Sequence, residues 1–379
     1  MVRSRFAPSP VVWIVLAAVA LTLLGLTVLF SASAALKAGP MATLGKQLMG
    51  VAGAVILAAL VSRLDLDYLR RHTGWIAGGL LLLLLIVLVP HIGLSVKGSR
   101  RWLGLGSLRL QVSEFAKLGM VFCLAHYVAL NQTRLGDWKR GYLYPLAIIA
   151  GFAGLVLAEP DFGTAALMVG VGLAMLFFAG AKWRHLIPTV LAVALLFAVA
   201  LMHNPNRMRR FTAFRHVDEN RAGANYQLYE SEVAFAAGGT YGVGLGRGRQ
   251  QYNYLPEAHN DYILGIIAEE LGLPFTMGVL VLFAGIFAAG LVHLRRAPNL
   301  FYSLLVAGCL LIVALQAMIN FASVTGVIPP KGMSLPFISA GLSNLLLMGL
   351  VVGVLINTQR TWGRARLPNQ AQAMREVLA

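Results

Sequence analysis

The sequence is poor in charge and especially poor in acids. Charged residues make up 12% of the chain, hydrophobic residues make up 58%, and only 15 of the 379 residues are Asp or Glu. Soluble domains carry roughly 25% charged residues. The composition therefore excludes a soluble fold, and it makes any cluster of acids informative.

Cysteine is almost absent as well. The sequence contains two, Cys123 and Cys309, and both lie within apolar runs. A disulfide framework or a zinc knuckle needs more cysteines at defined spacings. We expect both residues to be small members of the core.

A cleavable leader and a nucleotide-binding fingerprint are missing too. The first apolar run is flanked by Arg3 and Arg5, but it is too long for a signal peptide and lacks a small-residue cleavage site. The glycine run at 238–250 fits neither a Walker loop nor a dinucleotide fingerprint. We expect the first run to span a membrane.

Ten apolar runs have the length that crosses the hydrocarbon core of a bilayer, about 20 residues with some shorter. They predict an all-α polytopic integral membrane protein in which residues 1–379 form one domain. The runs cover residues 11–31, 46–62, 74–93, 112–131, 142–158, 163–180, 185–203, 275–294, 301–325 and 340–357.

Arginines and lysines decide the predicted orientation. They gather at the ends of the runs on alternate connections, from Arg3 and Arg5 at the start to the arginines of the tail at 358–379. Cytoplasmic loops of membrane proteins carry the excess of Lys and Arg. We therefore expect both termini to be cytoplasmic, with a large extracytoplasmic loop at 204–261.

Two of the outer connections are basic against this rule. Long loops are partly exempt from it, so a solvated surface is one explanation. A site for an anionic ligand is the other, because Arg donates forked hydrogen bonds to phosphate oxygens. The cations are Lys97, Arg100, Arg101, Arg109, Arg207, Arg209, Arg210, Arg215, Arg221, Arg247 and Arg249.

Two pairs of charged residues lie at span ends. Glu114 and Lys117 are three residues apart on one helix face, either as a structural ion pair or as part of a polar cavity. Glu159 and Asp161 flank Pro160 between the fifth and sixth spans. Asp161 can cap the next helix by accepting from its free N–H groups, whereas Glu159 adds a charge without a local partner.

Residues 252–272 hold the densest group of acids, with Glu257, Asp261, Glu269 and Glu270 close together. Asp261 either caps the helix that follows it or stands at the outer surface as a general base. That following run is too short to span a membrane. It predicts a separate short helix, interfacial or re-entrant, before the eighth span.

Two further features have alternative explanations, and a third is a stiff loop. The glycine run could be a flexible connection or a backbone cradle for phosphate. Gln316 and Asn320, four residues apart in the ninth span, fit hydrogen bonding between helices as well as they fit a site. Lys331 belongs to an outer loop that three prolines make stiff.

Taken in order, several blocks of the sequence resemble the SEDS family of shape, elongation, division and sporulation proteins, which includes RodA and FtsW. The ordered set is specific, although no single block is. Asn260 departs from the family pattern, as does the stretch 340–344. The matching blocks are 101–102 with 111–114, 159–164, 226–227 with the glycine run, 254–261, and 330–339.

The resemblance implies a peptidoglycan glycosyltransferase in the bacterial cytoplasmic (inner) membrane. It would polymerise lipid II for cell elongation or division, among membrane lipid and beside a class B penicillin-binding protein, and would not bind nucleic acid. Asp261 matches the residue regarded as essential in the family. The residues expected to bind lipid II or undecaprenyl-pyrophosphate-linked glycan are Arg101, Arg109, Glu114, Lys117, Glu159, Asp161, Arg209, Arg210, Gln227, Glu257, His259 and Lys331.

The expected mechanism uses Asp261 as the general base for an inverting hexosyl transfer. The departing pyrophosphate would lie among Arg101, Arg109, Arg209 and Arg210, which a divalent cation (Mg²⁺ or Mn²⁺) could assist, and no cofactor is certain. One rival is a lipid II flippase, which would place its polar groups near the bilayer midplane. The other is a non-catalytic scaffold that recruits a penicillin-binding protein and tolerates substitution of Asp261.

Overall fold

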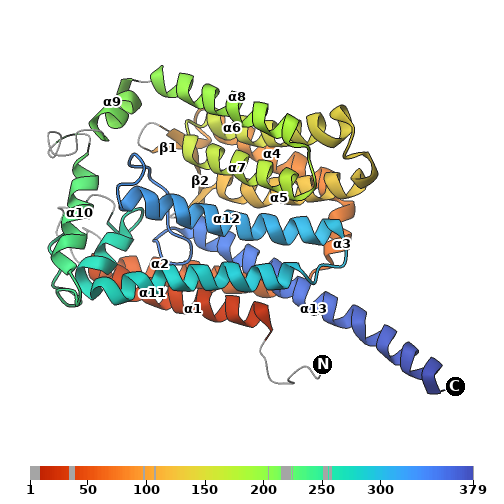
Figure 1. Cartoon of the computed structure of the whole chain (residues 1–379). Coiled ribbons are helices and arrows are strands. Elements are labelled where there is room, and N and C mark those ends of the chain that lie inside the picture. The colour runs from red at the N-terminus through yellow and green to blue at the C-terminus, as the bar shows by residue number, and fades with distance from the viewer. Residues whose placement is uncertain are drawn as a thin grey trace.

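The chain forms a bundle of apolar helices (Figure 1). The computed structural model describes residues 9–33, 39–96, 99–105, 108–203, 205–214, 223, 225–250, 255 and 258–378. Within these residues, ten apolar helices match the ten predicted spans, and eight of them are long enough to cross a membrane, α6 when the π turn that precedes it (Lys139–Leu143) is included. They are α1 (Pro10–Ala32), α2 (Gly39–Val61), α4 (Thr73–Leu88), α5 (Val112–Leu130), α6 (Tyr144–Ala158), α7 (Phe162–Phe178), α8 (Trp183–Met202), α11 (Ile263–Leu294), α12 (Leu300–Val324) and α13 (Leu342–Leu378). The all-α polytopic fold is confirmed.

The shorter elements lie at the two ends of the bundle. Helix α3 (Leu66–Arg71) and a 3₁₀ turn (Gln132–Arg134) connect spans, and a π turn (Lys139–Leu143) begins the span that α6 continues. The other end, at the left of Figure 1, carries α9 (Pro205–Phe214), α10 (Tyr226–Gly238) and strands β1 (Gly93–Val96), β2 (Ser99–Leu105) and β3 (Leu108–Gln111). We call this second end the loop-rich end.

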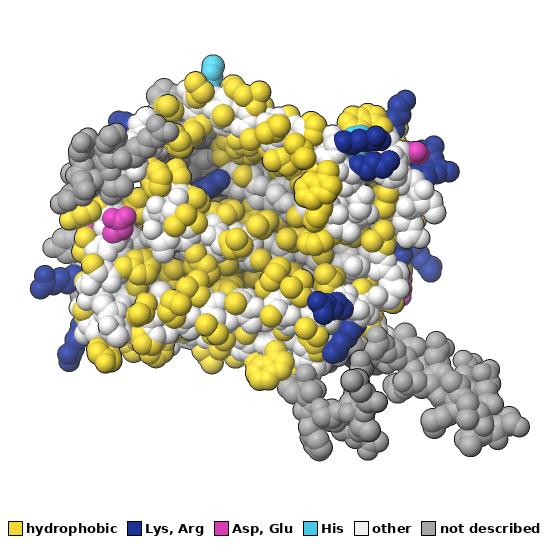
Figure 2. Space-filling view, in the orientation of Figure 1, with side chains coloured by type: hydrophobic (Ala, Val, Ile, Leu, Met, Phe, Trp, Pro, Cys, Tyr) yellow, Lys and Arg dark blue, Asp and Glu magenta, His cyan; other side chains and the backbone are white. Residues whose placement is uncertain are grey.

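The sides of the bundle are apolar, as a lipid-facing surface requires. Figure 2 shows hydrophobic side chains over most of one side, with Lys and Arg concentrated toward the ends. Helix α8 exposes large apolar residues along its length, including Leu191, Leu195 and Leu196. Such a surface would be an aggregation site in water but matches hydrocarbon.

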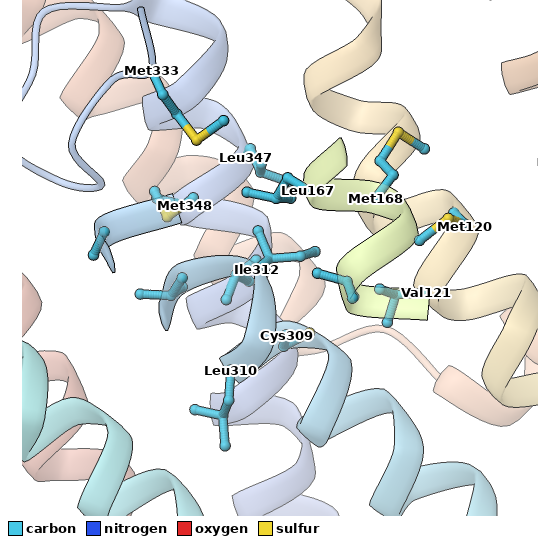
Figure 3. Packing of buried hydrophobic residues seen from close by; sticks show 14 of the residues in the cluster. Met120, Val121, Leu167, Met168, Cys309, Leu310, Ile312, Met333, Leu347 and Met348 are labelled. Atoms are coloured by element: carbon cyan, nitrogen blue, oxygen red, sulfur yellow. The ribbon is translucent and has the colours of Figure 1, made fainter. Parts of the chain in front are cut away.

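The core lies where α5, α7 and α12 meet (Figure 3). Val121, Met168 and Cys309 are fully buried there. Gly308 lets α5 and α12 approach closely, because a Cβ atom added at Gly308 would overlap the side chain of Val121. Cys123 is also buried, so both cysteines are core residues, as predicted.

Helices α2 and α13 make a second close contact through small residues. A Cβ atom added at Gly349 would overlap the carbonyl oxygen of Ala54, and one added at Gly353 would lie 2.9 Å from the carbonyl oxygen of Ala58. The spacing of four between these glycines puts both on one face of α13. Small residues at this spacing allow helix backbones to pack in a membrane, where no hydrophobic force draws apolar helices together.

A small antiparallel sheet in the order β1-β2-β3 was not anticipated from the sequence. Strand β2 contains Arg101 and pairs on one side with β1 and on the other with β3, where Trp102 lies opposite Gln111. Strand β3 runs directly into α5, whose N-cap is Gln111. The sheet therefore ties Arg101 to the first turn of α5.

Helix α11 consists of two helices that meet at a kink. Gly272 has φ 75° and ψ −167°, which no helix accommodates. Residues 263–271 are mostly buried within the protein and residues 273–294 form the apolar span. The predicted separate short helix before the eighth span is confirmed, and its burial favours the re-entrant alternative over the interfacial one.

Candidate active site

Asp261 lies at the loop-rich end, in the segment that precedes α11. Asn320 of α12 donates from Nδ2 to the carbonyl oxygen of Asp261 at 2.8 Å. Ser339, in the loop between α12 and α13, donates from Oγ to the carbonyl oxygen of Asn260 at 2.6 Å. The backbone of Asp261 is thus positioned by α12 and by the loop that follows it.

The side chain of Asp261 lies beside a loop that is distant in sequence. Helix α11 begins at Ile263 and its N-cap is Tyr262, so Asp261 stands one residue before the cap position. The carboxylate lies against the backbone of Gly332, where an added Cβ atom would be 2.6 Å from Asp261 Oδ2. Asp261 is half-buried, which keeps its carboxylate within reach of a ligand.

Lys331, in the loop between α12 and α13, reaches the start of α7. Its backbone exchanges two hydrogen bonds with Ser323, since the Lys331 amide donates to Oγ at 2.8 Å and Oγ donates to the Lys331 carbonyl at 3.2 Å. Its Cε atom would be 2.9 Å from a Cβ atom added at Gly163. The absence of a side chain at Gly163 therefore makes room for the stem of Lys331.

Asp161 caps α7, as predicted, and also joins α7 to the sheet. Its Oδ1 accepts from the Thr164 amide at 3.2 Å, and its Oδ2 accepts from the Thr164 hydroxyl at 3.0 Å. The same Oδ2 accepts from Gln111 Nε2 at 3.1 Å and forms an ion pair with Arg101 Nη1 at 3.1 Å. Arg101 is thereby held beside the N-terminus of α7.

Glu159 lies in the turn between α6 and α7 and is fully buried. Among the described residues, neither of its carboxylate oxygens has a hydrogen-bond partner. Burial raises the pKa of Glu159 to about 8, the negative charge of Asp161 adds to the increase, and Arg101 opposes it. Glu159 is therefore a neutral acid at pH 7, a state in which its burial without a partner is least costly.

Glu114 and Lys117 form a buried ion pair at the start of α5, with 2.9 Å between Oε2 and Nζ. Lys117 also donates to Gln316 Oε1 at 2.9 Å. Gln316 in turn donates to the carbonyl oxygen of Ser334 and to Asn344 Oδ1. The pair is thus both structural and part of a polar region that joins α5, α12 and α13.

We call these hydrogen-bonded and ion-paired groups together the polar network. Its named members are Arg101, Gln111, Glu114, Lys117, Asp161, Asp261, Gln316, Asn320, Lys331 and Asn344. Figure 2 shows that this side of the molecule is hollowed between the levels of α8 and α12, with a Lys or Arg side chain inside the hollow.

Three other predicted site residues lie outside the polar network. Arg109 on β3 and Arg209 on α9 are exposed and Gln227 is half-buried, and no hydrogen bond or ion pair given by the described part of the chain joins them to the network. His259 is half-buried, and its carbonyl oxygen accepts from the Ala340 amide at 3.0 Å. Glu257 and the side chain of Arg210 are not among the described residues.

Sequence reasoning missed two members of the network and two residues that hold its loops. Gln111 and Asn344 were not expected in the site, and neither were Ser323 and Ser339, which bond the backbones of Lys331 and Asn260. One signal was available, because Gln316, Asn320 and Ser323 follow the i, i+4, i+7 spacing of a single helix face. A polar face on an otherwise apolar span usually lines a protein interior or a cavity. The partners of these side chains depend on loops distant in sequence.

Most amides of the glycine run are hydrogen-bonded within the protein, which argues against both of its predicted roles. Its amides are bound by two buried acids of α11: Arg249 N donates to Glu269 Oε1 at 2.8 Å, and Gly246 N donates to Glu270 Oε1 at 3.1 Å. Gln250 N also donates to Glu269. These amides are not available to a phosphate, and the connection is held in place by hydrogen bonds.

A polytopic helical bundle with a polar network at one end defines the class of the protein, and comparison with known proteins identifies its family. The model of the cell cycle protein family FtsW/RodA/SpoVE matches residues 11–362. The chain belongs to this family, and the resemblance seen in the sequence is confirmed.

Several relatives and solved structures are similar over most of the chain. A probable peptidoglycan glycosyltransferase FtsW of Coxiella burnetii is 38% identical and covers 91% of this chain and 94% of its own. Stage V sporulation protein E of Bacillus subtilis is 37% identical over 73% of this chain and 76% of its own.

Among solved structures, a chain of a peptidoglycan synthase complex that polymerises and crosslinks has a TM-score of 0.78 at 26% identity, covering 92% of this chain and 97% of its own. The rod shape determining protein RodA of Thermus thermophilus has a TM-score of 0.69 at 26% identity, covering 91% and 95%.

Proposed function

We propose that this chain is a peptidoglycan glycosyltransferase whose general base is Asp261. The activity is supported by relatives called probable peptidoglycan glycosyltransferases, which are 34–38% identical over most of the chain. The role of Asp261 is supported by one observation above all. The half-buried carboxylate of Asp261 lies against Gly332, next to Lys331. The side chain of Lys331 extends to the start of α7, which is capped by Asp161, the ion-pair partner of Arg101.

The chemistry requires one proton transfer and one displacement. Asp261 accepts the proton of the acceptor 4-hydroxyl as that oxygen attacks the anomeric carbon of the donor. The bond from the anomeric carbon to the pyrophosphate oxygen breaks, the configuration inverts, and undecaprenyl pyrophosphate leaves with the bonding electrons. A carboxylate positioned within hydrogen-bond distance of that hydroxyl accelerates such a step by about 100-fold or more.

Cations stabilise the charge that grows on the leaving pyrophosphate. Lys331 and Arg101 are the favoured candidates, because both reach the first turn of α7. An N-terminal helix end adds partial positive charge from its free amides. In this proposal Arg101 exchanges its contact with Asp161 for one with phosphate. Arg109, Arg209 and Arg210 stay candidates for binding more distant parts of the substrate.

A divalent cation would depend mainly on the substrate for its ligands. Among the described residues there is no group of three or more His, Cys, Asp or Glu side chains that could hold a metal ion. Mg²⁺ bound at phosphates often uses only one or two protein carboxylates. Asp261 and the pyrophosphate would be the ligands of a Mg²⁺ or Mn²⁺ ion in that case.

The proposal also includes a partner protein and the orientation of the chain in the membrane. The solved complex that resembles this chain combines polymerisation with crosslinking, which supports a class B penicillin-binding protein as partner. The distribution of Arg and Lys supports cytoplasmic termini in the inner membrane, with the polar network at the outer surface. Lipid II would then enter from the outer leaflet.

Purified protein with its partner and lipid II in detergent tests the proposal. Asp261→Asn removes the base and changes little else in shape, so we expect glycan polymer to fall below detection. Asp137→Asn is the matched change at an exposed acid distant in sequence from Asp261. It should leave the amount of polymer at the wild-type value. Normal glycan strands from Asp261→Asn would refute its role as base, and no polymer from the wild type would favour a flippase or a scaffold.

A further inference from the structure

The glycine run forms a rigid loop, which we call the glycine loop (residues 239–250). Four of its glycines, Gly239, Gly242, Gly244 and Gly246, have φ between 51° and 100°. Residues with side chains rarely adopt this region. The backbone of Gly242 also touches α11 so closely that an added Cβ atom would overlap the carbonyl oxygen of Glu270.

Glu269 and Glu270 bind the glycine loop from inside the protein. Beside the side-chain contacts described above, their backbone carbonyls accept from Val243 N at 2.9 Å and from Gly244 N at 3.0 Å. Ser31 of α1 donates to Glu270 Oε1 at 2.6 Å. The polar backbone of the glycine loop is thus bound inward, so its side chains are the part presented to the surroundings.

Those side chains are apolar at the tip and basic next to it. Tyr241 is 90% exposed and Leu245 is 51% exposed, and Val243 between them is also exposed. Arg247 and Arg249 follow with exposed side chains. Exposure of three apolar side chains on one loop is unfavourable in water and indicates a contact with an apolar surface.

The glycine loop lies beside the start of an apolar span. The Leu273 amide donates to the Gly239 carbonyl at 3.1 Å, and the kink at Gly272 directly precedes the span. Leu273, Phe275 and Met277 at the start of this span are exposed and so face lipid. Figure 1 places the connection between α10 and α11 at the loop-rich end, next to the end of α1.

We propose that the glycine loop is an interfacial anchor that inserts Tyr241 and Leu245 among lipid chains while Arg247 and Arg249 bind the phosphate groups of anionic phospholipids. Amphipathic aromatic rings concentrate at the headgroup level of membranes, and arginines beside them reach the phosphates. The apolar tip is continuous with the lipid-facing surface of α11, and the charge of the arginines complements an anionic lipid surface. Because Glu269 and Glu270 hold the loop, the anchor would also keep the short helix at 263–271 at constant depth.

Spin labelling of the full chain in lipid nanodiscs measures this insertion. Cys123 and Cys309 are buried, so a nitroxide reagent should label Leu245→Cys selectively. The control is wild-type protein treated with the same reagent, which should stay unlabelled. We expect the ratio of oxygen to nickel-chelate accessibility at Leu245→Cys to be several-fold above that at Arg100→Cys in β2. It should remain below that at Val281→Cys, an exposed position well inside the α11 span.

A label at Tyr241→Cys provides an independent second position. Ratios at both positions equal to that at Arg100→Cys would overturn the proposal, and would show that the apolar tip faces water or awaits a partner protein. The lipid charge is tested in nanodiscs of phosphatidylcholine with and without phosphatidylglycerol. Phosphatidylglycerol should raise the ratio at Leu245→Cys, and Arg247→Gln with Arg249→Gln should abolish that increase. Equal ratios in both lipids would overturn the assignment of the arginines to anionic headgroups.

Discussion

Asp261 and Gly332 are in direct contact, and the space between them has no room for another atom. A Cβ atom at Gly332 would lie 2.6 Å from Asp261 Oδ2. The carboxylate proposed as the base is thus positioned by the missing side chain of a residue in another loop. Both the geometry of the base and the position of Lys331 depend on this contact.

Replacing Gly332 with alanine should therefore displace the carboxylate. We expect kcat for lipid II polymerisation to fall by about 100-fold with a smaller change in KM, because a displacement of about 1 Å at a catalytic group has that effect. A gel assay of glycan strands measures it. Gly341→Ala is the matched control, since the nearest atom to its added Cβ is 3.8 Å away. Equal activity of the two variants would contradict the positioning role of Gly332.

Glu159 should make stability depend on pH. Its pKa is raised to about 8 from 4.5 in the folded protein, so the folded state holds a proton that the unfolded chain releases. Stability then falls as the pH rises from about 4.5 to about 8 and levels off above that, with a loss of a few kcal/mol at most. Glu159→Gln, which cannot ionise, should lose this decrease.

Thermal unfolding in detergent at pH 5 and pH 9 measures the effect of Glu159. The wild type should have the lower Tm at pH 9, and the variant should show a smaller difference between the two values. Asp137→Asn controls for the pH response of the remaining chain, because Asp137 is exposed. An unchanged pH response in Glu159→Gln would argue against a neutral Glu159.

The buried pair of Glu114 and Lys117 predicts a non-additive result. Lys117→Met leaves the Glu114 carboxylate buried without its cation, which typically costs about 3–5 kcal/mol. Adding Glu114→Gln removes that uncompensated charge, so the double variant should be more stable than Lys117→Met alone. Tm values of both single variants and the double variant complete the cycle. A double variant less stable than either single variant would contradict this account.

Close packing of α2 and α13 makes Gly349 sensitive to a single methyl group. Gly349→Ala should destabilise the protein by about 1–3 kcal/mol, because the added atom meets the backbone of Ala54, which cannot rotate away. Gly278→Ala on α11 is the control, as its added Cβ atom has no neighbour within 4 Å. Differential scanning fluorimetry compares the two, and equal Tm values would show that α13 can shift without loss.

Features that depend on local sequence were predictable. The apolar runs determined the ten spans, because the length and composition of each run decide whether it can cross a membrane. The ion pair of Glu114 with Lys117 followed from their spacing of three residues, and the cap at Asp161 followed from its place directly before the sixth span. Asp261 was distinguished from the other acids by its sequence block.

Tertiary structure alone decided which distant residues meet. Gly332 and Asp261 are far apart in sequence, as are Lys331 and Gly163, and no periodicity couples them. The glycine loop shows the same limit, since the acids that bind its amides, Glu269 and Glu270, lie about 20 residues further on and on another element. Periodicity in the sequence indicates which face of a segment is buried. Which segment packs against that face depends on side-chain packing and on the requirement that each buried polar group be hydrogen-bonded.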